Sequence, residues 1–125
     1  MSQTGRVVWA DLTVRDAPAV RDFYRAVIGW EPSPVSMGDY NDFNMTPPAS
    51  DSGAVGICHA RGGNANLPPQ WLIYVPVKDL AESAKTCEQL GGAVLHRSEH
   101  GFCVIRDPVG AVMVICQAKP KEQRP

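Results

Sequence analysis

An internal repeat with an offset of 63 residues constrains the fold of this chain more than any other feature. The triplet Val14-Arg15-Asp16 aligns with Val77-Lys78-Asp79, and at the same offset Gly29 aligns with Gly92. An apolar run precedes each triplet, and a segment of helical pattern follows it. Later in each copy, residues 53–60 resemble residues 110–118 with one residue of slip. Such a duplication predicts two copies of one module, each with a strand, a helix and then several strands.

Local chemistry predicts a helix in each copy. In the first copy Asp16 is a suitable N-cap, Pro18 falls in the first turn, and Gly29 allows a left-handed end. Apolar residues recur at helical spacing between these ends, namely Val20, Phe23, Tyr24, Val27 and Ile28. In the second copy Asp79 and Glu82 form a capping-box pattern, and two glycines follow the segment.

The other apolar segments have the length of strands and are rich in Val, Ile and aromatic residues. Strands are expected at Val7–Val14, Tyr40–Met45, Ala54–Ala60, Leu72–Val77, Ala93–His96, Phe102–Arg106 and Ala111–Gln117. Residues 32–35 predict an edge strand interrupted by proline. Residues 46–53 and 62–69 are crowded with Pro, Gly, Ser and Asn, which predicts loops.

Length and composition favour one globular domain. The 125 residues are expected to form a single domain. It comprises a first module at residues 5–61, a linker at 62–70, a second module at 71–118 and a frayed tail at 119–125. Charged residues make up 20% of the chain and the formal net charge is −1 without a basic run, which argues against nucleic-acid binding. No apolar run approaches the roughly 20 residues of a membrane span. No apolar segment of signal-peptide type is present either, so a cytoplasmic location is expected.

The four cysteines do not form a metal or disulfide pattern. None belongs to a CxxC pair, and three lie in apolar, strand-like runs; they are Cys58, Cys87, Cys103 and Cys116. The simpler interpretation is that all four are reduced thiols that act as small hydrophobic side chains. The alternative is one reactive thiol, for which Cys58 beside His59 is the candidate.

Several motifs in order resemble those of a known family. The segment from Val14-Arg15-Asp16 through Phe23-Tyr24 to Gly29-Trp30 resembles the opening of the glyoxalase/bleomycin-resistance/extradiol-dioxygenase superfamily, also called vicinal-oxygen-chelate proteins. The turn Asp107-Pro108-Val109-Gly110 is similar to the D-P-x-G turn before that family's final strand. The resemblance implies an α+β fold of two tandem βαβββ modules that form an open curled barrel around a cavity. It also implies a homodimer.

Metal-dependent members of the superfamily place His, Glu or Gln ligands on the first and last strands of both modules. Counting from the V-x-D aspartates and the D-P-x-G glycine puts these positions at Trp9, Leu72, Val114 and either Gly56 or Ile57. None of these side chains offers a lone pair to a cation. The histidines, His59, His96 and His100, lack the spacing of substitute ligands. We therefore expect no metal and no cofactor, and no glyoxalase I or extradiol dioxygenase chemistry.

If Trp9 faces the cavity, strand alternation predicts which other side chains do so. The predicted ligand-binding residues are Trp9, Asp11, Tyr40, Asp42, Asn44 and Tyr74. Aromatic walls with a few polar anchors are typical of a small-molecule site. In the alternative, Trp9 plugs the barrel, Tyr74 lies in a dimer interface, and the polar face of Asp42 and Asn44 meets solvent. Trp71 is expected to stabilise the linker loop rather than cap the cavity.

These observations leave three functions open. The leading prediction is a metal-independent protein that binds a small organic molecule, such as a toxic or antibiotic-like compound that it sequesters. The second is a cofactor-free lyase, isomerase or hydroxylase-like enzyme in which Asp11 or Asp42, with a pKa raised by partial desolvation, acts as the base. The third is a dimerisation scaffold without a ligand. Nucleic acid and membrane partners are not expected.

Overall fold

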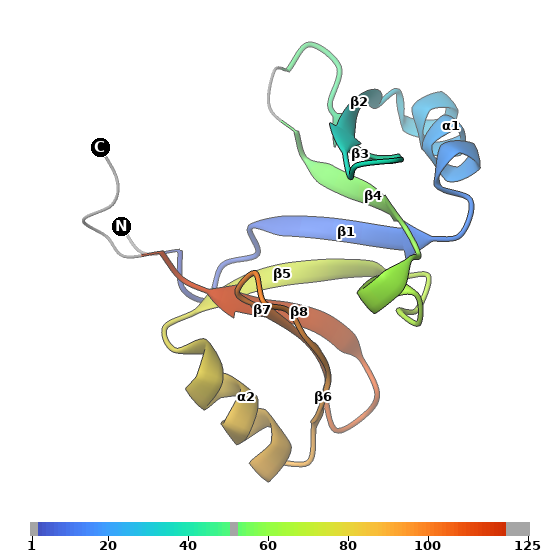
Figure 1. Cartoon of the computed structure of the whole chain (residues 1–125). Helices are drawn as coiled ribbons and strands as arrows, with labels where there is room; N and C mark the ends of the chain where they lie inside the picture. Colours follow the sequence, from blue (N-terminus) through green and yellow to red (C-terminus); the bar gives the residue numbers. More distant parts are fainter. Residues whose placement is uncertain (1–2, 51–52, 120–125) are drawn as a thin grey trace. The chain divides into compact units, whose positions relative to one another are not determined.

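A computed structural model of the chain describes residues 3–50 and 53–119 (Figure 1). The chain forms two compact units: the first comprises residues 9–71, and the second comprises the described parts of residues 1–8 and 72–125. Each unit holds a helix and four strands in the order βαβββ. The predicted α+β class with two tandem βαβββ modules is therefore confirmed.

The first unit consists of one helix and a mixed four-stranded sheet. Its elements are β1 (Trp9–Val14), α1 (Ala17–Ile28), β2 (Glu31–Ser36), β3 (Asn41–Thr46), β4 (Val55–His59) and a short 3₁₀ turn, η1 (Gly62–Asn64). The strand order is β2-β3-β4-β1, with β1 and β4 parallel and the other neighbours antiparallel. Because β2 is the edge strand of this sheet, its two prolines remove no central ladder bond, as predicted.

The second unit repeats this arrangement. Its elements are β5 (Trp71–Val77), of which only Trp71 belongs to the first unit, α2 (Leu80–Gln89), β6 (Ala93–Arg97), β7 (Phe102–Arg106) and β8 (Val112–Gln117). The strand order is β5-β8-β7-β6, and β5 and β8 are parallel, as β1 and β4 are in the first unit. The repeat in the sequence is thus a repeat of topology.

Both helices begin, and α1 ends, as their local sequence predicts. The Asp16 carboxylate accepts the N–H of Ala19 at 3.2 Å, and the Asp79 carboxylate accepts the N–H of Glu82 at 3.1 Å. Helix α1 ends at Gly29, whose φ of 88° is a left-handed conformation that side chains disfavour. Neither described helix combines the length and apolar character needed to cross a membrane.

Each helix covers one face of the sheet in its own unit, as the ribbon of Figure 1 shows. In the first unit the buried residues on this face are Ala17, Phe43, Met45 and Ile57. In the second unit they are Ala84, Cys103 and Ile115. Met45 and Ile57 are fully buried, and each such side chain contributes about 1.5–3 kcal/mol through removal from water.

The strand expected at Val7–Val14 begins two residues later than predicted. Strand β1 starts at Trp9, whereas the residues before it belong to the second unit. There the Val8 N–H donates to the Tyr74 carbonyl and the Gly5 N–H to the Pro76 carbonyl, both at 2.9 Å. The apolar run is therefore divided, because Val8 hydrogen-bonds to β5 and strand β1 begins only at Trp9.

The segment expected as a linker, residues 62–70, falls within the first unit and contains η1. At its end the Trp71 indole N–H donates to the Tyr24 hydroxyl at 3.2 Å. The Trp71 ring also packs edge-on against the rings of Tyr24 and Trp30. Trp71 thus fastens the end of this loop to the core beside α1. Of the predicted tail, residues 120–125 lie outside the described part of the chain.

Candidate functional site

The face of the first unit's sheet that points away from α1 is largely polar. Strand register pairs Asp11 of β1 with Gly56 of β4, and Gly56 with Asn44 of β3. Because the alternate residues of these strands pack against α1, the paired side chains lie on the opposite side. We call this side the inner face; it comprises Trp9, Asp11, Thr13, Asp42, Asn44, Gly56 and Cys58.

Trp9 and Asp11 interact directly on the inner face. The indole Nε1–H of Trp9 donates to Asp11 Oδ1 at 2.6 Å in a partly buried position. Gly56 makes room for this pair, since a Cβ there would collide with Asp11 Oδ1 and lie 3.4 Å from Trp9 Nε1. The glycine thus lets a carboxylate and an indole lie over the middle of the sheet. The indole N–H holds the carboxylate as a fixed hydrogen-bond acceptor.

A second carboxylate, Asp42, lies at one end of the inner face and is only 8% exposed. Its Oδ1 accepts the backbone N–H of His59 at 2.8 Å and lies 3.1 Å from the Nδ1 of the same residue. This contact fixes the imidazole ring, whose edge also meets the ring of Tyr40 at a centroid distance of 5.1 Å. Asp42 therefore ties β3 to the end of β4 and orients a histidine.

Cys58 lies close enough to both carboxylates to feel their charge. Burial, followed by the negative charges of Asp11 and Asp42, raises the pKa of the Cys58 thiol far above its ordinary value. A hydrogen bond with Asp42 acts in the same direction, because it favours the protonated thiol. At neutral pH the thiol is protonated, so Cys58 does not have the character of a catalytic nucleophile.

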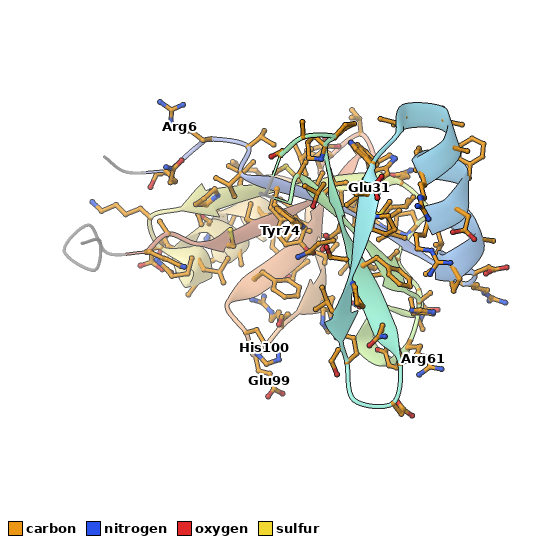
Figure 2. All side chains as sticks on the ribbon, turned by 90° about the horizontal axis from the view of Figure 1, so that it is seen from above. Arg6, Glu31, Arg61, Tyr74, Glu99 and His100 are labelled. Atoms are coloured by element: carbon orange, nitrogen blue, oxygen red, sulfur yellow. The ribbon has the colours of Figure 1, made fainter. Side chains whose placement is uncertain are left out.

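Tyr40, Arg61 and Asp39 lie at the outer edge of the inner face, at the same end as Asp42. The Arg61 guanidinium lies 3.9 Å from the centre of the Tyr40 ring and 3.7 Å from the Asp39 carboxylate. Figure 2 shows Arg61 beside the turn that joins β2 and β3. This cation–π contact holds Tyr40 against the end of β4.

The structure brings five of the six predicted binding residues into the first unit. Trp9 and Asp11 are in contact, Asp42 and Asn44 lie on β3, and Tyr40 lies at the strand's start beside His59. The sixth, Tyr74 (labelled in Figure 2), belongs to β5 in the second unit. Its ring centre is 6.1 Å from that of Phe102.

Two residues of this site, Gly56 and His59, are not among the binding residues predicted from the sequence. Gly56 was noted only as one possible ligand position, although a glycine between two apolar residues in a strand can mark a close approach of another group. His59 contacts a carboxylate 17 residues away, and no local pattern signals such a contact.

The structure also decides which residue occupies the fourth ligand position of the family. In the second unit Tyr74 pairs with Val114, and at the repeat offset Asp11 pairs with Gly56. Gly56 is therefore the counterpart of Val114, while Ile57 is fully buried on the side of α1. The four positions, Trp9, Gly56, Leu72 and Val114, supply no metal-ligating atom. These positions therefore do not fit the family's metal, and among the described residues no three His, Cys, Asp or Glu side chains are placed to hold a metal ion.

Comparison with known proteins gives a family and curated relatives. The family model described as a Glyoxalase-like domain matches residues 7–116. Proteins named "Putative glyoxylase CFP32" from Mycobacterium bovis and Mycobacterium tuberculosis are 25% identical over 98% of this chain. The match covers 48% of each of those proteins, so this chain spans about half the length of the curated relatives.

Solved structures with a similar fold include two methylmalonyl-CoA epimerases. The enzyme from Mycobacterium tuberculosis has a TM-score of 0.56 at 15% identity, over 98% of this chain and 93% of that chain. A variant of the Streptomyces coelicolor enzyme in complex with 2-nitronate-propionyl-CoA has a TM-score of 0.53 at 20% identity, over 93% of this chain and 98% of that chain. At these identities the likeness establishes the fold.

Proposed function

Because this chain belongs to the Glyoxalase-like domain family, we propose that it keeps the family's use of the inner face for small molecules but binds them without a metal ion. The observation that carries this proposal is the hydrogen bond between Trp9 and Asp11 over Gly56. An indole occupies one of the family's ligand positions, and the carboxylate that it fixes lies over Gly56, which occupies another. A ligand would then be held by contacts to organic groups alone.

The chemistry of the inner face defines what such a ligand should carry. Trp9 offers a flat apolar surface, whereas Asp11, Asp42 and Asn44 offer hydrogen-bond acceptors. A few fixed polar groups beside an aromatic wall suit a small organic molecule. Planar compounds with amino or hydroxyl groups complement this combination, because their donors can reach the carboxylates.

The biological role we propose for this binding is sequestration of a toxic or antibiotic-like compound in the cytoplasm. A homodimer is part of the same proposal, since the family resemblance implies one and the curated relatives are about twice as long as this chain. Sedimentation velocity tests that part directly. A dimer should sediment with twice the chain mass of 13.5 kDa.

A thermal-shift screen of planar amines and phenols, in buffer with EDTA, tests the binding proposal. A ligand present at 100 times its Kd should add about 2.7 kcal/mol to stability. Stabilisation should be lost in Asp11→Asn and kept in Asp22→Asn, which changes an exposed carboxylate on α1. The absence of any stabilising compound, or equal stabilisation of both variants, would reject the proposal.

The contact between Asp42 and His59 favours a second candidate, a cofactor-free lyase, isomerase or hydroxylase-like enzyme. A buried carboxylate beside an oriented imidazole is an arrangement that can accept a proton from a substrate. Compounds found in the screen would be incubated with the protein, and their products sought by mass spectrometry. Turnover that disappears in Asp42→Asn while the ligand still binds would support the enzyme over the binding protein.

A further inference from the structure

A hollow of about 260 Å³ lies on the other side of the first unit's sheet. It is lined by Arg21 of α1, Pro32 and Pro34 of β2, and Asn41 and Phe43 of β3. Phe43 packs in the core beside α1, so this hollow is separate from the inner face. We propose that it is a second binding site, for a small aromatic carboxylate.

Rigid apolar rings form the wall of the hollow. Pro32 and Pro34 are two residues apart on β2, and Pro34 is paired with Phe43 in the ladder between β2 and β3. Proline rings and a phenylalanine that is only 9% exposed have little freedom to lose when a ligand binds. A flat aromatic ring can therefore pack against the two proline rings and the exposed part of Phe43 at a small entropic cost.

Arg21 supplies the charge that selects a carboxylate. Its side chain is 28% exposed, and its guanidinium carbon lies 4.8 Å from the centre of the Phe43 ring. The Nε–H donates to Asp22 at 2.9 Å. Within the part of the chain that the structure describes, the two terminal amino groups have no hydrogen-bond acceptor. Their planar fork matches both oxygens of a carboxylate.

The remaining lining residue and the size of the hollow limit the ligand further. The Asn41 side chain can donate a second hydrogen bond to a carboxylate oxygen or to a ring substituent. Pockets for drug-sized ligands measure about 300–1,000 Å³, so 260 Å³ suits a single substituted ring. The positive charge of Arg21 disfavours an amine, which separates this site in chemistry from the acidic inner face.

Titration of the ¹⁵N-labelled protein with benzoate, followed by ¹H–¹⁵N NMR, tests the proposal. We expect saturable shifts at the Arg21 Nε–H, the Asn41 side-chain amide and the backbone N–H of Phe43. Benzyl alcohol at the same concentrations should cause none of them, since it lacks the carboxylate. Arg21→Gln should weaken benzoate binding at least about tenfold, because the charge-assisted fork is lost.

Arg25→Gln is the matched control, because Arg25 lies one turn later on α1 and pairs loosely with Glu31 at 4.0 Å. It should bind benzoate as the unchanged protein does. Arg21→Lys and Asn41→Ala guard against a folding defect in Arg21→Gln, and each should weaken binding while preserving the spectrum. Shifts that do not saturate, shifts centred on the inner face, or equal affinity in folded Arg21→Lys and Asn41→Ala would overturn the proposal.

Discussion

Trp9 and Asp11, two residues apart on β1, are joined side chain to side chain by a 2.6 Å hydrogen bond that passes over Gly56 of the neighbouring strand. The pair depends on the absence of a side chain at position 56. A metal-ligating side chain at position 56 of β4 could not lie on this face together with the Trp9–Asp11 pair.

Gly56→Ala should therefore destabilise the protein by about 1–3 kcal/mol, the usual cost of forcing an extra carbon into a packed site. The new Cβ would collide with Asp11 Oδ1, so the carboxylate must turn away and lose the hydrogen bond from Trp9. Urea unfolding at pH 7 measures this cost. Gly53→Ala is the control, since its Cβ would meet Trp9 at 3.4 Å, an ordinary contact, and it should cost less.

The double variant Asp11→Ala/Gly56→Ala checks the cause. Removal of the Asp11 carboxylate removes the collision, so the two changes should be non-additive and the double variant should be more stable than the sum predicts. Strict additivity would show that Gly56 matters for another reason, such as strand conformation.

A second prediction concerns Asp42, which accepts the partly buried backbone N–H of His59. Asp42→Ala should cost about 1–3 kcal/mol, because a donor in a largely buried position loses its acceptor. Asp42→Asn should cost less, since the amide oxygen can still accept that N–H. His59→Gln keeps the backbone bond and tests the contribution of the ring alone. Among the three variants, Asp42→Ala should have the lowest urea midpoint. Equal midpoints for the two Asp42 variants would contradict this prediction.

Both helices could be predicted from the sequence because their signals are local. An N-cap acts on a backbone N–H three residues away, as Asp16 and Asp79 do, and a glycine with positive φ marks the end at Gly29. The 63-residue repeat then gave the order of the remaining strands, since a second copy of a module must have the same topology.

The details of the site could not be predicted in the same way. Counting left Gly56 and Ile57 as alternatives, and one residue of register moves a side chain to the opposite face of a sheet. Only the pairing of β1 with β4 decided between them. The contact of His59 with Asp42 and the position of Arg21 over Phe43 each join different elements, and their geometry depends on packing rather than on spacing along the chain.

A third prediction concerns the Trp71–Tyr24 hydrogen bond that holds the end of the segment 62–70. Tyr24→Phe keeps the ring and its edge-on contact with Trp71 at 5.4 Å but removes the hydroxyl acceptor. The expected loss of stability is about 0.5–1.5 kcal/mol. Tryptophan fluorescence during urea unfolding measures the loss and should also report a changed native spectrum. Tyr40→Phe, which leaves this contact intact, should retain the native spectrum; identical spectra for both variants would contradict the assignment.

The raised pKa of the Cys58 thiol makes a fourth prediction, on pH dependence. In the unfolded chain a cysteine loses its proton near pH 8.5, whereas burial keeps Cys58 protonated in the native state well above that pH. Above about pH 8.5 the native state binds more protons than the unfolded state. The contribution of the protonated Cys58 thiol to stability is therefore complete below about pH 8.5 and decreases as the pH rises. The fall should reach about 2 kcal/mol by pH 10, from a slope of about 1.4 kcal/mol per pH unit.

Burial also raises the pKa of Cys116, so the comparison must isolate Cys58. Urea unfolding at pH 7, 9 and 10 should show the stability of the unchanged protein decreasing relative to Cys58→Ala, and a constant difference between the two would mean that Cys58 ionises as readily in the native state as in the unfolded one.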